Sequence, residues 1–184
     1  LLPDKPVLIT FDDGYLNNLE LAYPLLQKYH FKAVIFIATS FIGTEILQDG
    51  YPTLHMSIEQ LKTLEPSLIE FGLHSHLHNS YSAMNVQEIE KDLDICLDIF
   101  NTHQIPFVPA LAYPYGARPK EEIILKQMKE LFKRKGIKVA FRIGNKINSF
   151  SPDDLYELKR IDITGNDSFR AFKAKLKKGR IKLF

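Results

Sequence analysis

Cysteine is scarce in this sequence, and long apolar runs are missing from it. The single cysteine, Cys96, excludes an internal disulfide, leaves the redox compartment open, and lies in line with Leu93 and Phe100 on a helical apolar face. The longest apolar stretches, such as residues 33–38, are far shorter than the roughly 20 residues that a membrane-spanning helix needs. They also lack the flanks of a signal peptide, so we expect no transmembrane segment.

Internal repeats, low-complexity tracts and linker-like stretches are also absent. The length of 184 residues predicts a single domain, spanning 1–184, which can bury a core without disulfides or a structural metal. Because the sequence opens at Leu1 rather than at methionine, we expect it to be a piece of a longer chain.

Acidic residues are missing from the last fifteen positions, which carry Arg170, Lys173, Lys175, Lys177, Lys178, Arg180 and Lys182. Such a charge run is typical of a solvated helix face, and the alternative is contact with an anionic polymer or membrane surface. A nucleic-acid platform would need aromatic side chains interleaved with the basic ones, and only Phe169, Phe172 and Phe184 lie in or directly before this run. We therefore expect no nucleic-acid partner.

Short apolar runs alternate with amphipathic segments along the chain. The pattern predicts strands at 7–11, 33–37, 68–73, 107–113, 139–143 and 158–163. It predicts helices at 19–29, 85–103, 120–135 and 168–178, and a capping box at 57–60 opens one more short helix. This repeated strand-helix order predicts an α/β fold with a parallel sheet covered by helices, either doubly wound or closed as a barrel.

Two adjacent carboxylates, Asp12 and Asp13, end the first predicted strand. Neighbouring side chains on a strand point to opposite faces, so these two can converge only if the strand stops and the backbone turns, which Gly14 permits. A pair of carboxylates repels itself unless a cation neutralises it or one member is protonated. The alternative is an ordinary Asp-Gly turn with solvated carboxylates.

Two further groups of polar residues follow other strands. His74 and His78 come after the third predicted strand, and a turn around Tyr115 ends the fourth. The carboxyl ends of parallel strands share one edge of the sheet, so these groups are expected on one rim with Asp13. A lone histidine pair is more often surface or core, and a proline turn is often only a turn. Two histidines with one carboxylate, however, are a set that holds a divalent metal and leaves positions open.

Three motifs carry a family resemblance: residues 10–14 (TFDDG), 74–78 (HSHLH) and 112–116 (AYPYG). They resemble, in order and spacing, the first three motifs of the polysaccharide deacetylases, the NodB-homology domain of carbohydrate esterase family 4. The resemblance covers most of the chain, from Pro6 to about Ile163. It implies a distorted (β/α) barrel and metal-dependent removal of N-acetyl groups from a polysaccharide that contains N-acetylglucosamine.

The same resemblance implies a role for individual residues. Asp12 would be the general base, Asp13, His74 and His78 would bind one divalent ion, with zinc expected, and the backbone N–H of Tyr115 would help to hold the oxyanion. His76, between the ligands, is expected to be exposed or to support them. The family also implies an N-acetylated glycan as partner and a location at the cell surface or outside the cell.

The sequence departs from the family pattern in two places. Ala112 stands where many members have an arginine that orients the base, which resembles the branch acting on poly-N-acetylglucosamine; Arg160 could replace that arginine or form a structural salt bridge. No histidine follows His103 to serve as the late general acid. In that branch the acid lies upstream, so we expect it before Leu1, with His55 as the internal alternative.

Six predicted strands are fewer than a closed seven- or eight-stranded barrel has, so we expect a barrel that is incomplete at its amino end. Two other functions stay open from sequence: hydrolysis of a different non-peptide C–N bond, as in chitin, peptidoglycan or a small amide, and a noncatalytic glycan-binding module. The identity of the glycan, the native metal and the oligomeric state are not readable from the residues.

Overall fold

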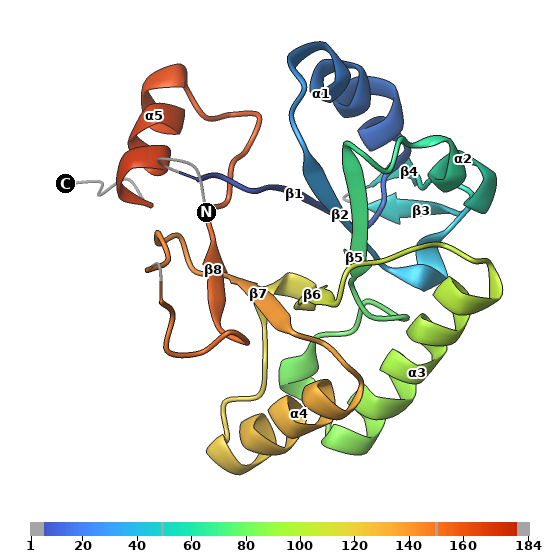
Figure 1. The fold of residues 1–184 in the computed structure, drawn as a ribbon, viewed down its shortest axis with the longest axis vertical. Helices are drawn as coiled ribbons and strands as arrows, with labels where there is room; N and C mark the ends of the chain where they lie inside the picture. Colours follow the sequence, from blue (N-terminus) through green and yellow to red (C-terminus); the bar gives the residue numbers. More distant parts are fainter. Residues whose placement is uncertain (1–5, 49, 150, 180–184) are drawn as a thin grey trace.

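The computed structural model describes residues 6–48, 50–149 and 151–179. Its main feature is a parallel sheet of six strands in the order β1-β2-β5-β6-β7-β8. The strands are β1 (Ile9–Asp12), β2 (Ala33–Ile37), β5 (Ile69–Leu73), β6 (Ala110–Ala112), β7 (Val139–Ile143) and β8 (Leu158–Arg160). The sheet curls into a half-barrel with helices around its outer side (Figure 1). The parallel sheet predicted from the strand-helix order is thus confirmed, in its barrel form.

Five α-helices accompany the sheet: α1 (Tyr23–Tyr29), α2 (Ile58–Thr63), α3 (Val86–Thr102), α4 (Glu122–Arg134) and α5 (Phe169–Lys178). A π-helix, η1 (Asn18–Ala22), leads into α1, and single 3₁₀ turns form η2 (Thr39–Phe41), η3 (Tyr81–Ala83) and η4 (Pro114–Gly116). Complete capping boxes begin α2 at Ser57 and α3 at Asn85, as the sequence predicts. None of the described helices combines the length and apolar character that crossing a membrane requires.

An antiparallel hairpin, β3 (Glu45–Gln48) with β4 (Tyr51–Leu54), was not predicted. No apolar alternation marks this stretch of the sequence, and Leu47 and Tyr51 are both largely exposed in the structure. Strand β6 is shorter than expected. Pro109, which has no N–H to donate to a sheet ladder, precedes it directly, and Pro114 follows soon after.

The sheet has an apolar core on each face. On the outer side, Ile35, Leu73 and Leu111 pack in the core against the helices, together with the fully buried Cys96. On the concave side a smaller cluster is formed by Val34, Phe36, Ala110 and Ala112, with Phe141 packed against it. The alternation along β2 therefore points Phe36 into the half-barrel, and the register pairs it with Asp12 of β1.

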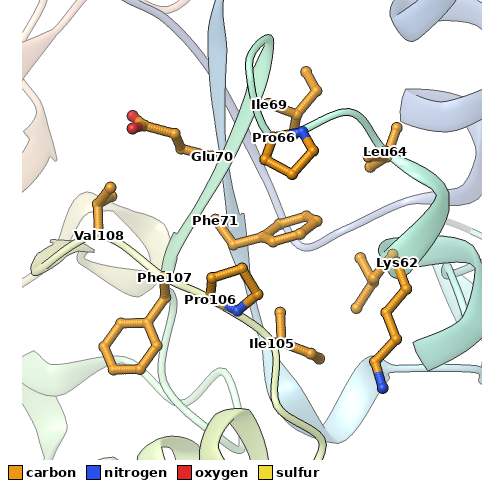
Figure 2. A pocket seen from close by; sticks show the side chains of 11 residues that line it. Lys62, Leu64, Pro66, Ile69, Glu70, Phe71, Ile105, Pro106, Phe107 and Val108 are labelled. Carbon is orange, nitrogen blue, oxygen red and sulfur yellow. The ribbon is translucent and has the colours of Figure 1, made fainter.

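The amino ends of β5 and β6 border an apolar pocket of about 280 Å³ (Figure 2). The two strands pair at Leu73 and Leu111, and toward the pocket the N–H of Val108, before β6, donates to the carbonyl of Phe71 at 2.8 Å. Phe71, Ile105 and Pro106 are among the side chains that line it. Its lining carries no cluster of titratable groups.

Helix α5 stands apart from the other four helices (Figure 1). It buries none of its side chains fully, and Arg170, Lys173, Lys177 and Lys178 are exposed, as expected of a solvated helix face. Arg180 and Lys182, which extend the basic run in the sequence, lie outside the described residues.

Candidate metal centre and active site

The backbone turns sharply where β1 ends. Asp12 is the last residue of the strand, Asp13 follows with φ of 69°, and Gly14 has φ of 80° and donates its N–H to the carbonyl of Asp12 at 2.9 Å. A Cβ on Gly14 would lie 2.8 Å from Cδ1 of Ile37, so only glycine fits there without displacement. The predicted turn therefore exists, and it brings both carboxylates to the carboxyl-end rim.

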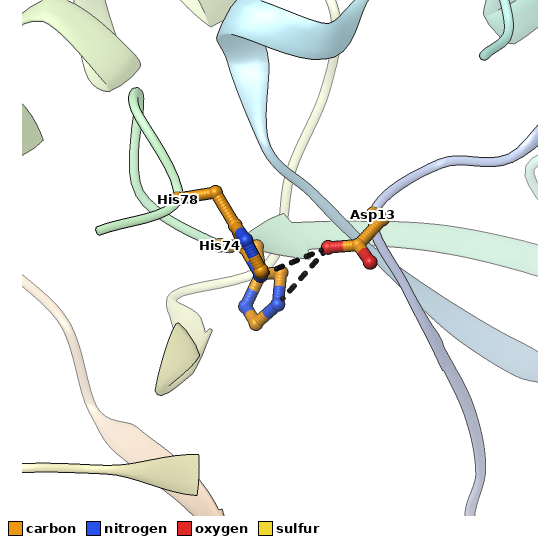
Figure 3. Close-up of side chains that lie close together, drawn as sticks. All are labelled: Asp13, His74 and His78. Carbon is orange, nitrogen blue, oxygen red and sulfur yellow. Dashed lines mark ion pairs between the residues drawn. The ribbon is translucent and has the colours of Figure 1, made fainter. Parts of the chain in front are cut away.

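Asp13, His74 and His78 converge at this rim (Figure 3). Oδ1 of Asp13 lies 3.4 Å from Nε2 of His74 and 3.2 Å from Nε2 of His78. The three side chains are 12%, 2% and 13% exposed, respectively, so the cluster is largely withdrawn from water. The structure thus brings together the three residues that the resemblance implies as metal ligands.

The hydrogen bonding of His74 tests whether the cluster fits a metal. Its Nδ1 lies 2.7 Å from the carbonyl oxygen of Ala112, which can only accept, so Nδ1 carries a proton. In the neutral ring Nε2 then presents a lone pair to Oδ1 of Asp13, a buried atom without a hydrogen-bond partner in the described part of the chain. Two facing acceptors need a positive charge between them, which is either a second imidazole proton or a metal ion.

The donor set suits a divalent ion. Two imidazole nitrogens and one carboxylate oxygen are ligands of zinc and of similar transition metals. In a tetrahedral site with bonds of about 2.0 to 2.1 Å, ligand atoms lie about 3.3 Å apart. The separations of 3.2 and 3.4 Å around Oδ1 agree with that value. The cluster therefore fits a metal, although its chemistry does not single out zinc.

The local environment keeps these groups in the protonation states that a metal requires. Burial raises the pKa of Asp13, but its interactions with His74, Tyr15 and His78 outweigh that effect, and the pKa lies below its usual value. Burial also lowers the pKa of His78, more than the charge of Asp13 raises it. An ionised carboxylate and a neutral imidazole are both competent ligands.

Asp12 takes a different partner from its neighbour. Nη1 and Nη2 of Arg160 each lie 2.6 Å from one carboxylate oxygen of Asp12, a bidentate pair in the half-barrel. The guanidinium also lies over the ring of Phe36, 5.5 Å from its centre. Because β1 and β8 are the two edges of the sheet, this pair links them across the opening. Oδ2 of Asp12 is 3.8 Å from Nε2 of His74, so the carboxylate borders the cluster.

Tyr115 lies at the same rim, in the turn that follows β6. It lies in η4 with φ of 58° and ψ of 13°, and its ring, 68% exposed, stands 4.6 Å from the ring of His78. Gly116 after it has φ of 63°, and a Cβ there would lie 2.7 Å from the backbone nitrogen of Ile143. The turn is therefore held in a conformation that side chains resist, with Tyr115 beside the cluster.

Left-handed backbone marks all three loops of the rim. Asp13, Ser75, His78 and Tyr115 have φ values of 69°, 68°, 57° and 58°. Each such residue costs of order 1 to 3 kcal/mol, and conformations of this kind gather at functional sites, where they preorganise the groups. The strain supports a functional role for the rim that does not depend on the motifs.

Two further residues, Tyr15 and Arg160, support the carboxylates of the site. Tyr15 donates its O–H to Oδ2 of Asp13 at 2.7 Å, which orients Oδ1 toward the two imidazoles. Arg160, which the sequence left as either a replacement for the orienting arginine or a member of a structural salt bridge, contacts Asp12 itself. The contact of Tyr15 could have been found from the sequence, since Tyr15 follows the Asp-Asp-Gly turn directly. The contact of Arg160 with Asp12 could not, because it joins residues far apart in the chain.

His76 and His55 are not members of the cluster. Nδ1 of His76 is 3.0 Å from Oγ1 of Thr39, so this ring points elsewhere than its neighbours. His55 is 4% exposed, and its ring packs against those of Tyr15 and Phe41, each with centres 4.9 Å away. His55 therefore stands behind the rim rather than on it.

Comparisons with known proteins bear on this arrangement. The family model described as polysaccharide deacetylase matches residues 2–140. A poly-beta-1,6-N-acetyl-D-glucosamine N-deacetylase from Staphylococcus epidermidis is 30% identical over 178 residues, which cover 91% of this chain and 57% of the relative. The chain spans about half the length of the curated relatives that it matches.

Two solved structures share the architecture. The deacetylase PplD from Streptococcus pyogenes, in complex with acetate, superposes with a TM-score of 0.77 at 22% identity, covering 96% of this chain and 73% of its own. IcaB from Ammonifex degensii gives a TM-score of 0.76 at 23% identity, with 98% and 75% covered. These similarities confirm the distorted, incomplete (β/α) barrel expected from the three motifs.

Proposed function

The chain belongs to the polysaccharide deacetylase family, and from this premise we propose that it is a metal-dependent hydrolase that removes N-acetyl groups from a polysaccharide containing N-acetylglucosamine. The observation that carries the proposal is the buried cluster of Asp13, His74 and His78 with Asp12 at its border. We assign the first three as ligands of one divalent ion, with zinc as the expected metal, and Asp12 and Tyr115 as catalytic residues.

An amide is a poor electrophile, so its hydrolysis requires activation of both partners. When bound, the ion supplies Lewis-acid chemistry: it polarises a carbonyl and makes water acidic enough to lose a proton near pH 7. Asp12 is placed to receive that proton, because its Oδ2 lies 3.8 Å from the Nε2 of His74 while Arg160, not the cluster, pairs with the carboxylate.

The arginine gives Asp12 a fixed orientation. Two parallel hydrogen bonds hold the carboxylate plane, and the side chain is 30% exposed, so substrate water can reach it. In this proposal Arg160 takes the position of the arginine that many family members carry where this chain has Ala112. It acts on the reaction through Asp12 and is therefore a positioning residue.

Attack on the carbonyl places negative charge on its oxygen, and a fixed donor stabilises that charge best. We assign the backbone N–H of Tyr115 to this role. Its left-handed conformation, flanked by Pro114 and by Gly116, holds the peptide without help from a flexible side chain. The leaving nitrogen also needs a proton, and a histidine upstream of Leu1 as its donor stays a prediction.

The proposed substrate is poly-N-acetylglucosamine, which is what the name of the staphylococcal relative specifies for that protein. The sequence Ala112–Gly116 supports the same branch of the family. A glycan of this kind lies outside the cytoplasm, so we also propose a location at the cell surface or outside the cell. Oligomers of N-acetylglucosamine are the probe for both proposals.

Acetate release from these oligomers tests the function. The zinc-loaded full-length protein should release acetate, chelation should stop release, and added metal should restore it. Asp12→Asn should bind metal as the wild type does but lose about 10² to 10⁴ in rate, as expected when a general base is removed. Near-normal turnover by this variant would contradict the role of Asp12, and loss of metal would make Asp12 a ligand instead.

The same assay separates the alternatives. A noncatalytic glycan-binding module would bind the oligomers with metal present and release no acetate. A hydrolase of a different C–N bond would release acid from chitin oligomers, peptidoglycan fragments or small amides in preference to β-1,6-linked oligomers.

A further inference from the structure

Helix α3 carries a buried carboxylate that the proposed chemistry does not use. Asp92 is 4% exposed and lies among Ile89, Leu93 and Cys96 on the face of the helix that packs into the core. A carboxylate in such surroundings is costly unless its oxygens are hydrogen-bonded. In the described part of the chain, no lysine, arginine or histidine side chain forms an ion pair with it.

Its closest partners are two consecutive backbone amides of the loop between the proposed ligands, and the O–H of Tyr81 donates a longer hydrogen bond, of 3.5 Å, to Oδ2. Oδ2 of Asp92 accepts the N–H of His76 at 2.9 Å, and Oδ1 accepts the N–H of Leu77, also at 2.9 Å. The next amide, of His78, donates to Oγ of Ser75 at 2.9 Å. Three successive N–H groups are thus bound by side-chain oxygens, and Asp92 supplies two of these bonds from outside the loop.

The loop needs such an anchor because it is strained. Ser75 and His78 both have left-handed backbone, a conformation that persists only when surrounding structure enforces it. On the other side of the loop, the amides of Thr39 and Ser40 donate to the carbonyl oxygens of Ser75 and His76, at 3.2 and 3.0 Å. Asp92 is the charged member of this set of contacts, and charge-assisted hydrogen bonds are stronger than neutral ones.

The position of His78 depends on this anchor. His74 is already held by the sheet, since its amide donates to the carbonyl of Ile37 and its Nδ1 contacts Ala112. His78 lies in the loop after β5 and not in a strand, and the backbone that connects His74 to His78 contains the two amides that Asp92 binds. A shift of the loop would therefore separate the Nε2 of His78 from the Oδ1 of Asp13, which now lie 3.2 Å apart.

We propose that Asp92 is a positioning residue for the metal centre, and that its carboxylate sets metal affinity by holding His78 against Asp13 and His74. The inference rests on the proposed function only in taking these three residues as metal ligands. Supporting groups of this kind, which orient ligands without touching the metal, change metal affinity by about 10- to 100-fold when they are removed.

Metal titration of two Asp92 variants tests the proposal. Asp92→Leu fills a similar volume without an acceptor, and we expect zinc affinity, measured by calorimetry, to fall by about 10- to 100-fold. Asp92→Asn keeps one acceptor oxygen but presents an amide donor to the other N–H, so its affinity should fall between those of Asp92→Leu and the wild type. The visible absorption of bound Co²⁺, which reports ligand geometry, should change in the same order.

Asp98→Leu and Asp98→Asn are the matched controls, because Asp98 lies on the exposed face of the same helix. Both should bind zinc as the wild type does. All titrations are made below the melting temperature of each apoprotein, with folding verified by circular dichroism. If Asp92→Leu is too unstable to titrate, the decrease expected for Asp92→Asn decides.

The outcomes separate this inference from the proposed function. Wild-type affinity and an unchanged Co²⁺ spectrum in folded Asp92 variants would overturn the inference alone, even if their melting temperatures fell, because Asp92 would then serve only the fold. A wild-type protein that binds neither zinc nor Co²⁺ would overturn both proposals at once.

Discussion

The two ends of the parallel sheet differ in kind. At the carboxyl ends, Asp13, Ser75, His78 and Tyr115 adopt left-handed backbone, and two imidazole nitrogens converge on Oδ1 of Asp13, which has no hydrogen-bond partner among the described residues. At the amino ends the chain forms an apolar hollow of about 280 Å³, lined by Phe71 and other apolar side chains, with ordinary backbone in β5 (Figure 2). The apolar pocket thus lies at the amino ends of the strands, and the cluster of polar, chemically useful groups lies at their carboxyl ends.

This difference shows which kind of evidence locates a site here. A large apolar pocket is the usual first hypothesis for a binding site, but this one has no convergent polar groups. The rim holds strained backbone, a buried carboxylate oxygen without a hydrogen-bond partner in the described part of the chain, and an imidazole nitrogen that faces this oxygen. These features cost stability and persist only where other parts of the structure maintain them. We therefore expect substitutions at the rim to alter chemistry and those at the amino ends to alter stability.

The largest effect on turnover should come from Asp13→Asn. This substitution keeps the shape, tolerates left-handed backbone and can still accept from Tyr15, but it removes the charge that both imidazoles face. Metal affinity should fall by more than the roughly 10- to 100-fold that the loss of a supporting group costs, and acetate release should fall with it. Asp12→Asn is the matched neighbour, since it should keep metal and lose only turnover. Equal metal binding by the two variants would remove the distinction between ligand and base.

Arg160→Met should have the next largest effect. Without the bidentate pair, Asp12 loses its fixed orientation, and we expect a fall in kcat of about 10- to 100-fold, in the range seen for groups that orient a functional residue. Zinc affinity should be unchanged, because Arg160 contacts Asp12 and not the cluster. Arg160→Lys keeps the charge but not the two parallel hydrogen bonds, so it should recover part of the rate. A decrease in zinc affinity with kcat intact would contradict this role.

Local signals explain what the sequence predicts well. The capping boxes at Ser57 and Asn85 each depend on residues three positions apart, and the structure has both. The turn at Gly14 is local too. The three motif loops meet at one rim because parallel strands place their carboxyl ends together, which is a rule of topology rather than of sequence.

Non-local contacts explain what the sequence could not predict. Arg160 and Asp12 are 148 positions apart, so their pairing depends on how far the sheet curls. Asp92 looks like an exposed polar position in the sequence until the helix packs against the loop at His76. The hairpin at Glu45–Gln48 and Tyr51–Leu54 is exposed, so no apolar alternation marks its strands.

The amino ends of the sheet provide the contrasting substitution. Phe71 is 6% exposed and lines the pocket, so Phe71→Ala should lower the free energy of unfolding by about 3 to 5 kcal/mol, as large-to-small changes in a core do. Zinc affinity and kcat of the folded fraction should stay at wild-type values. Denaturant unfolding and acetate release, measured on the same sample, check both statements. A loss of kcat in the folded protein would mean that the two ends are coupled.

The smallest effect on turnover should come from His55, which lies just behind the rim but belongs to the core. Burial lowers its pKa below the ordinary value of 6.5, so the unfolded chain binds a proton there more readily than the folded one. The contribution of His55 to stability is therefore fully present above pH 6.5 and is lost as the pH falls from there through the lower folded pKa. His55→Phe should remove this part of the pH dependence. The melting temperature of the metal-free variant should then fall less than that of the wild type between about pH 6.5 and 5. His103→Gln, at an exposed helix end, is the control and should follow the wild type.

Acetate release should survive His55→Phe, because the ring is 4% exposed and packs behind Tyr15 and Phe41. A folded, zinc-binding His55→Phe variant without activity would instead identify His55 as the donor of the proton to the leaving amine, and the predicted histidine upstream of Leu1 would no longer be needed.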